Sequence, residues 1–123
     1  MPPLSTRSQL MVAGRLGLGI ACLAAPGLVV RLLGFPDRSG TASTFARMIG
    51  VRDLGVALFL LATAADPAAH RRAQQIAGLV DVGDVAAVAL GAVGDSRLRT
   101  AAARNLPFAG TSAIFSFLAA RAT

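Results

Sequence analysis

The chain of 123 residues is long enough for one domain, and its composition suits lipid better than water. Hydrophobic residues make up 54% of it and charged residues only 15%, with a mean hydropathy of +0.64, whereas soluble domains average about 25% charged residues. The net charge of +6 comes from arginines dispersed between apolar runs, which argues against nucleic-acid binding and favours anionic headgroups as counterions. The single cysteine, Cys22, excludes an intramolecular disulfide.

Four apolar segments joined by loops predict four transmembrane helices, at about 9–33, 45–65, 73–93 and 104–120. About 20 apolar residues cross a hydrocarbon core of about 30 Å, and short loops place consecutive helices antiparallel and adjacent. The expected fold class is therefore all-α: residues 1–123 form a single integral membrane domain, an antiparallel up-down bundle of four transmembrane helices. The alternative is a soluble four-helix bundle, which extraction with and without detergent would distinguish.

The first segment carries small residues at four-residue intervals, namely Ala13, Gly17, Ala21 and Ala25, and these give one side of the helix a smooth face for close packing. Pro26 and Gly27 predict a kink near its far end. Residues 34–44 are rich in turn formers and form the first loop. Ser43 or Thr44 is the expected N-cap of the second helix.

The second segment, 45–65, places charge inside an apolar run. Arg52 and Asp53 lie within its first turns, and a charge in hydrocarbon costs roughly 2.5 to 3.5 kcal/mol on insertion scales. Both side chains therefore need partners within the protein. The segment is expected to stop at Asp66 and Pro67, because a residue before proline is pushed out of helical geometry.

The third segment, 73–93, carries its polar residues on one face, because Gln74, Ala77, Asp81 and Asp84 follow one another at intervals of three and four. Gly83, Ala87 and Gly91 form a second seam of small residues on the same helix. Residues 94–103 are the third loop. In the fourth segment Asn105 is the expected N-cap, with Pro107 in the first turn, and Ser112 and Ser116 lie on one side.

Antiparallel pairing fixes which residues lie at equal depth. With the second helix ending near 65 and the third beginning near 73, Asp84 lies level with Leu54 and is the best partner for Arg52. The same reasoning across the third loop brings the serines of the fourth helix within about a turn of Asp84. The sequence thus predicts one buried polar cluster, composed of Arg52, Asp53, Asp81, Asp84 and Ser116.

Two interpretations of this cluster stay open. It is a structural clamp, or it is a site that handles protons or cations, because acids a turn apart in a medium of low dielectric cannot all ionise comfortably. His70, beside two arginines, is expected to be an interfacial loop residue and is a poor metal ligand as a lone imidazole. No catalytic residue, metal site or cofactor is expected.

The spacing Arg47-x-x-Gly50-x-Arg52-Asp53, followed by an apolar helix, resembles the signature of small four-helix membrane proteins, mainly bacterial, of the domain of unknown function DUF4267 and its DoxX-like relatives. The resemblance implies a multi-pass protein of the cell (inner) membrane. From the residues themselves, Arg47 can reach headgroups and Gly50 permits close helix approach. DoxX-like relatives imply a quinone-linked redox subunit, although the chain lacks a cysteine cluster or histidine pair.

Three functions follow as expectations. The first is a non-enzymatic accessory or scaffold subunit that packs, through its small-residue faces, against itself as a homo-oligomer or against a larger membrane complex. The second is a small proton- or cation-coupled transporter that uses the aspartates. The third, from the DoxX-like resemblance, is the redox subunit.

Overall fold

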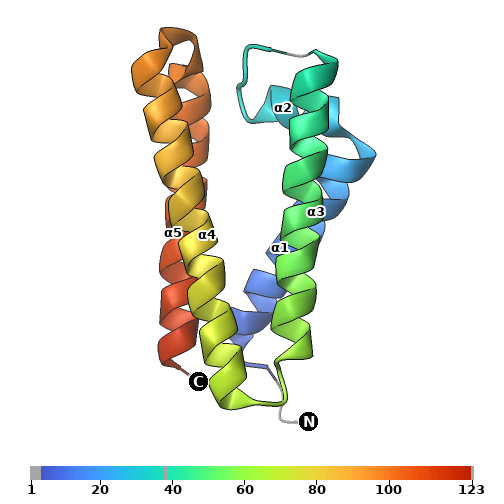
Figure 1. The fold of residues 1–123 in the computed structure, drawn as a ribbon, viewed down its shortest axis with the longest axis vertical. Helices are drawn as coiled ribbons and strands as arrows, with labels where there is room; N and C mark the ends of the chain where they lie inside the picture. Colours follow the sequence, from blue (N-terminus) through green and yellow to red (C-terminus); the bar gives the residue numbers. More distant parts are fainter. Residues whose placement is uncertain (1–3, 38, 123) are drawn as a thin grey trace.

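The computed structural model describes residues 4–37 and 39–122, and every regular element in that part of the chain is a helix. The all-α prediction is confirmed. The elements are α1 (Thr6–Ala24), α2 (Pro26–Leu32), α3 (Gly40–Ala62), α4 (Pro67–Gly94), the 3-10 helix η1 (Ser96–Leu98) and α5 (Arg99–Arg121). The four long helices alternate in direction along the chain (Figure 1).

The first predicted helix is two helices. α1 ends at Ala24, and Ala25 leaves helical geometry with φ −137° and ψ 57°, because it precedes Pro26, the first residue of α2. The chain bends by 115° between α1 and α2. The proline therefore does more than kink a continuous span over 9–33, since α2 turns away from the line of α1.

The other helices begin earlier than predicted. Ser39, rather than Ser43 or Thr44, caps α3 by accepting a hydrogen bond from the amide of Ala42. Asp66 caps α4, and Pro67 occupies its first turn, where a missing amide hydrogen costs nothing. The expected third loop is also mostly helical, since α5 begins at Arg99 and Asn105 lies inside it rather than capping it.

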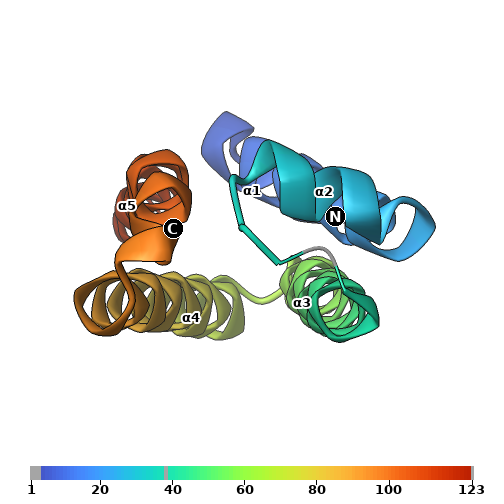
Figure 2. The same cartoon turned by 90° about the horizontal axis from the view of Figure 1, so that it is seen from above.

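The long helices form two pairs, α1 with α3 and α4 with α5, with few contacts between the pairs (Figure 2). α1 and α3 approach closely where Gly19 meets Gly50: a Cβ on Gly50 would lie 2.8 Å from the Gly19 carbonyl oxygen. In the other pair, the ring of Phe117 fills the space over Gly78. The predicted face at Ala13 and Gly17 does not take part, because both residues are exposed.

Many large apolar side chains point outward, whereas seven polar or charged residues of the described chain are buried beside a core composed mostly of alanine. Among the described residues, four of the six largest fully buried side chains are polar: Gln74, Asp53, Ser8 and Ser116. Large apolar side chains are exposed on every long helix, for example Leu58 at 61%, Leu79 at 63% and Leu90 at 72%. A soluble domain shows the reverse distribution, because water drives large apolar side chains inward.

Not every helix meets the requirements of a membrane span on its own. In the described chain, α4 alone is long and apolar enough, and α1 with α2 meets the same criterion only as a bent pair. α3 carries Arg47, Arg52 and Asp53 in its apolar part, and Arg99 and Arg104 lie in the first turns of α5. The expectation of four spans is therefore supported for one helix by length and composition.

Candidate functional site: a buried ionic chain

Arg15 of α1 lies at the centre of a set of buried charges. Its guanidinium donates from Nη1 to Asp53 Oδ1 of α3 at 3.0 Å and from Nη2 to Asp81 Oδ2 of α4 at 2.7 Å. A third, longer bond reaches the Ala77 carbonyl at 3.3 Å. Arg15, Asp53 and Asp81 are each at most 5% exposed. One arginine thus links both helix pairs through charge-assisted hydrogen bonds.

Arg52 extends the set toward the surface. Its guanidinium forms a bidentate pair with Asp84 of α4, at 2.5 Å from Nη1 to Oδ1 and 2.8 Å from Nη2 to Oδ2. Nη2 also reaches Asp53 Oδ1 at 3.3 Å. Asp84 is the partner of Arg52 that helix depth leads one to expect. The side chains of Arg52 and Asp84 are 33% and 35% exposed, so this pair forms the rim of the site.

Ser112 of α5 completes the set, because its hydroxyl donates to Asp81 Oδ2 at 2.8 Å. We call the whole set the ionic chain, since positive and negative groups alternate along it in the order Asp84, Arg52, Asp53, Arg15, Asp81 and then Ser112. It connects all four long helices. No other polar feature of the described residues does so.

The structure brings together four of the five residues predicted for the cluster. Ser116 is not among the ionic groups: it is buried, and its hydroxyl lies 3.9 Å from the Met11 sulfur. Ser112 takes its place because α5 begins at Arg99 instead of near 104, which shortens the connection and shifts the register of α5 by about one turn.

The sequence reasoning missed Arg15, the central residue. A continuous helix over 9–33 would place Arg15 far from Asp53 in depth. The break at Ala25 moves α1 along α3 until Gly19 faces Gly50. Arg15, one turn before Gly19, then lies level with Asp53, nearly one turn after Gly50. Two features of the sequence could have indicated Arg15. Pro26 predicts a break in the helix, and the buried Asp53 needs a cation in addition to Arg52.

A second polar group lies nearer the α3–α4 turn, which we call the end network. His70 Nδ1 lies 3.1 Å from the Leu60 carbonyl, an acceptor, so Nδ1 carries the hydrogen and Nε2 accepts from Ser8 Oγ at 3.1 Å. The Gln74 amide donates to the same Ser8 hydroxyl. The expectation of an interfacial loop residue was wrong, since His70 belongs to α4 and is 2% exposed.

The ionic chain is suited to holding helices together. Neither of two surface pockets in the described part of the chain is lined by one of its residues. The set contains three carboxylates and two guanidiniums. Within 4–37 and 39–122, no group of three or more His, Cys, Asp or Glu side chains is arranged to hold a metal ion.

The motif that carried the family resemblance falls at the same place. Arg52 and Asp53 belong to the ionic chain, Gly50 makes the close contact with α1, and Arg47 is exposed. Comparison with family models matches DUF4267, a domain of unknown function, over residues 12–121. The chain belongs to the DUF4267 family. The match includes every residue of the ionic chain. No curated protein and no solved structure matches, so the family relationship stands without a named relative.

Proposed function

We propose that this DUF4267 protein is a multi-pass protein of the cell membrane that serves as a non-enzymatic accessory or scaffold subunit. In this proposal its four long helices form a transmembrane bundle, and the ionic chain is the clamp that fixes their arrangement. The observation that carries the proposal is the inverted distribution of side chains, with the buried Arg15, Asp53 and Asp81 of the ionic chain inside and large apolar side chains outside.

Membrane insertion is supported by which side chains face outward and by which residues hold the helices together. Exposed leucines and phenylalanines on α1, α3, α4 and α5 match acyl chains. Helices in lipid gain no hydrophobic energy from association, so small residues and interhelical hydrogen bonds hold them together. The Gly19–Gly50 contact and the ionic chain provide both.

A role as a subunit is supported by small-residue faces that the fold leaves open. Ala13 and Gly17 of α1 are exposed, and so are Gly83 and Ala87 of α4. A Cβ at Gly17 or Gly83 would meet nothing within 4 Å. Such faces let a helix of a second copy or of another membrane protein approach closely.

Crosslinking in native membranes tests this proposal. With Cys22 replaced by alanine, single cysteines at Gly17 and Gly83 should give crosslinked adducts at native expression, because these faces are expected to contact a partner. A cysteine at Val82, which is 46% exposed and lies about 100° around α4 from Gly83, is the matched control. A strictly monomeric protein without adducts at Gly17 or Gly83 would contradict the subunit role.

A second candidate function is proton or cation coupling, and one observation favours it. The ionic chain has one more carboxylate than guanidinium, and Asp84 at its rim is partly exposed. A buried excess charge is relieved by a proton or a cation. Asp84→Asn should then abolish pH-linked flux into vesicles without affecting insertion, and unchanged flux would eliminate this function.

The relationship to DoxX-like proteins is a further proposal, supported so far by the motif spacing alone. It implies a quinone-linked redox subunit. Extraction of the purified protein and chromatography of the extract would test it directly, since a stoichiometric quinone would support the relationship and its lack would count against it.

A further inference from the structure

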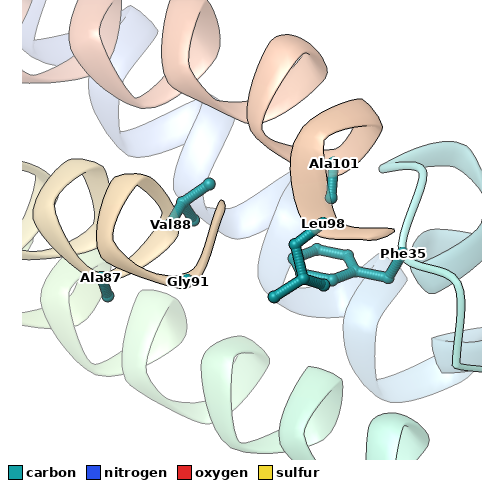
Figure 3. Close-up of a pocket in the computed structure, with 6 residues that line it drawn as sticks. All are labelled: Phe35, Ala87, Val88, Gly91, Leu98 and Ala101. Carbon is teal, nitrogen blue, oxygen red and sulfur yellow. The ribbon is translucent and has the colours of Figure 1, made fainter. Parts of the chain in front are cut away.

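An apolar pocket of about 220 Å³ lies away from the ionic chain, where the two helix pairs diverge. Figure 3 shows that α4, η1, α5 and the loop after α2 all contribute to it. The lining residues are Phe35, Ala87, Val88, Gly91, Leu98 and Ala101. All of them are apolar, and together they leave a site without a side-chain hydrogen-bonding group.

The end of α2 places Phe35 in this pocket. Gly34 has φ +80°, its amide donates to the Arg31 carbonyl, and the amide of Phe35 donates to the Val30 carbonyl. This is the Schellman arrangement, which reverses the chain after a helix and favours glycine at the left-handed position. The ring of Phe35 consequently lies beside Leu98 (Figure 3).

The chemistry of the lining selects an apolar occupant. Water needs two or more polar partners to occupy a cavity, and an apolar cavity of about 150 Å³ stays dry and takes a benzene ring. The pocket here is larger, at about 220 Å³. A segment of hydrocarbon chain fits both its volume and its lining.

Arginines surround the same end of the molecule. The Arg104 side chain passes over Gly34, next to Phe35, and its Nη1 donates to the Leu32 carbonyl at 3.0 Å. Arg99 follows directly after Leu98 and is exposed. Neither has an acidic partner in the part of the chain that the structure describes.

Asp95, four residues before Arg99, is already paired with another arginine. Asp95 accepts hydrogen bonds from the Arg97 side chain and its backbone amide, and these bonds lower the pKa of Asp95. Asp95 therefore stays ionised and balances Arg97. On the other side of Phe35, Asp37 accepts hydrogen bonds from Ser39. Arg99 and Arg104, which form none of the ion pairs among the described residues, therefore place positive charge next to the apolar pocket.

We propose that this pocket binds one acyl chain of an anionic phospholipid, whose phosphate is held by Arg99 and Arg104. An anionic lipid matches both halves of the site, since its chain is apolar and its headgroup is negative. The site rests on the proposed membrane location, and it includes Ala87 of the α4 face that the scaffold role assigns to a partner.

Native mass spectrometry of the detergent-purified full chain, with added phosphatidylglycerol or phosphatidylcholine, tests the pocket. Ala87→Phe fills the pocket from its exposed edge and should reduce retained phosphatidylglycerol about tenfold. Ala86→Phe is the control, because Ala86 is equally classed as exposed on α4 but does not line the pocket. Equal retention by the two variants would overturn the proposal.

The headgroup is tested separately. Arg99→Gln and Arg104→Gln should each reduce the preference for phosphatidylglycerol over phosphatidylcholine about fivefold, as expected for loss of about 1 kcal/mol per arginine. Arg71→Gln and Arg72→Gln, at the other end of the molecule, should leave the preference unchanged. An unchanged preference in the first pair, or an equal loss in both pairs, would overturn the headgroup assignment.

Two further outcomes separate this proposal from the membrane proposal. A wild-type chain that requires detergent but retains neither lipid would contradict the lipid site and leave membrane insertion intact. A chain that remains in solution without detergent would contradict both. If Ala87→Phe changes the oligomeric state and wild type retains no lipid, a second copy occupies the pocket and the lipid site is wrong.

Discussion

The two ends of the molecule are built differently. At the closed end, near the α3–α4 turn, the end network and Leu60 join α1, α3 and α4. At the open end, which contains α2, Phe35 and η1, apolar side chains surround a pocket. The helix pairs diverge toward the open end (Figure 1).

This difference indicates that polar groups, more than large apolar side chains, join the α1–α3 pair to the α4–α5 pair. Side-chain hydrogen bonds between the α1–α3 and α4–α5 pairs lie in the ionic chain, near the middle of α3 and α4, and in the end network. At the open end, Arg104 and Asn105 of α5 donate only to the Leu32 and Leu33 carbonyls at the end of α2. In lipid an apolar surface gains nothing by leaving its solvent. Without polar partners, the α1–α3 and α4–α5 pairs have little reason to stay in contact.

The largest expected effect comes from Arg15→Met. This variant removes the cation that the buried Asp53 and Asp81 carboxylates share and leaves Asp53 with only the longer contact of 3.3 Å to Arg52, so we expect a loss of about 3 to 5 kcal/mol in the free energy of unfolding. Denaturation of the detergent-solubilised protein in sodium dodecyl sulfate measures it. Arg7→Met, an exposed position on the same helix, is the control, and equal stability of the two variants would contradict the role of Arg15.

The same substitution at each end sharpens the comparison. Leu60 is fully buried, so Leu60→Ala should cost about 2 to 3 kcal/mol through the cavity it creates. Leu98 borders an existing pocket, and Leu98→Ala should cost less than about 1 kcal/mol. Thermal unfolding of both variants in the same detergent measures the two losses of stability. Equal losses would mean that the two ends are equally well packed.

A pair of glycines on α3 tests the contact within one helix pair. A Cβ at Gly50 would lie 2.8 Å from both Cys22 Cβ and the Gly19 carbonyl oxygen, whereas one at Gly55 would meet nothing. Gly50→Ala should therefore destabilise the protein by about 1 to 2 kcal/mol. Gly55→Ala should be neutral or stabilise it by up to about 1 kcal/mol, because alanine favours helix. If Gly55→Ala were the more destabilising variant, the close contact between α1 and α3 would not lie at Gly50.

The smallest effects separate two serines of α5. Ser112 donates to the buried Asp81 carboxyl group at 2.8 Å, and Ser112→Ala should cost about 1.5 kcal/mol. Ser116 contacts only the weak acceptor of Met11, so Ser116→Ala should cost about 0.5 kcal/mol. Unfolding measurements on both variants would detect the difference. A larger loss at Ser116 would restore it to the cluster in place of Ser112.

Much of this architecture was predictable because it depends on local signals. The all-α class follows from four apolar segments, and the pairing of Arg52 with Asp84 follows from the short turn at Asp66, which fixes the depth of α4 against α3. Aspartate spacing on α4 was also sufficient to place Asp81 on the same face as Asp84.

The remaining features depend on where helices end in space. Arg15 was missed because its contact depends on the break at Ala25, and Ser116 was chosen over Ser112 because the third loop was assumed to be longer. His70 was misplaced since Asp66 starts α4 one and a half turns earlier than hydrophobicity indicated. Each error is a shift of register, which apolar periodicity alone does not determine.

The most direct test of the inverted architecture is to measure whether lipid or water contacts the outward-facing side chains. Spin labels at Leu58 and Leu79, introduced singly with Cys22 replaced by alanine, report collisions with oxygen, which partitions into lipid, and with a water-soluble nickel complex. These residues are 61% and 63% exposed. We predict high oxygen and low nickel accessibility in reconstituted vesicles at both sites, and high nickel accessibility at both would contradict a bundle whose apolar surface faces lipid.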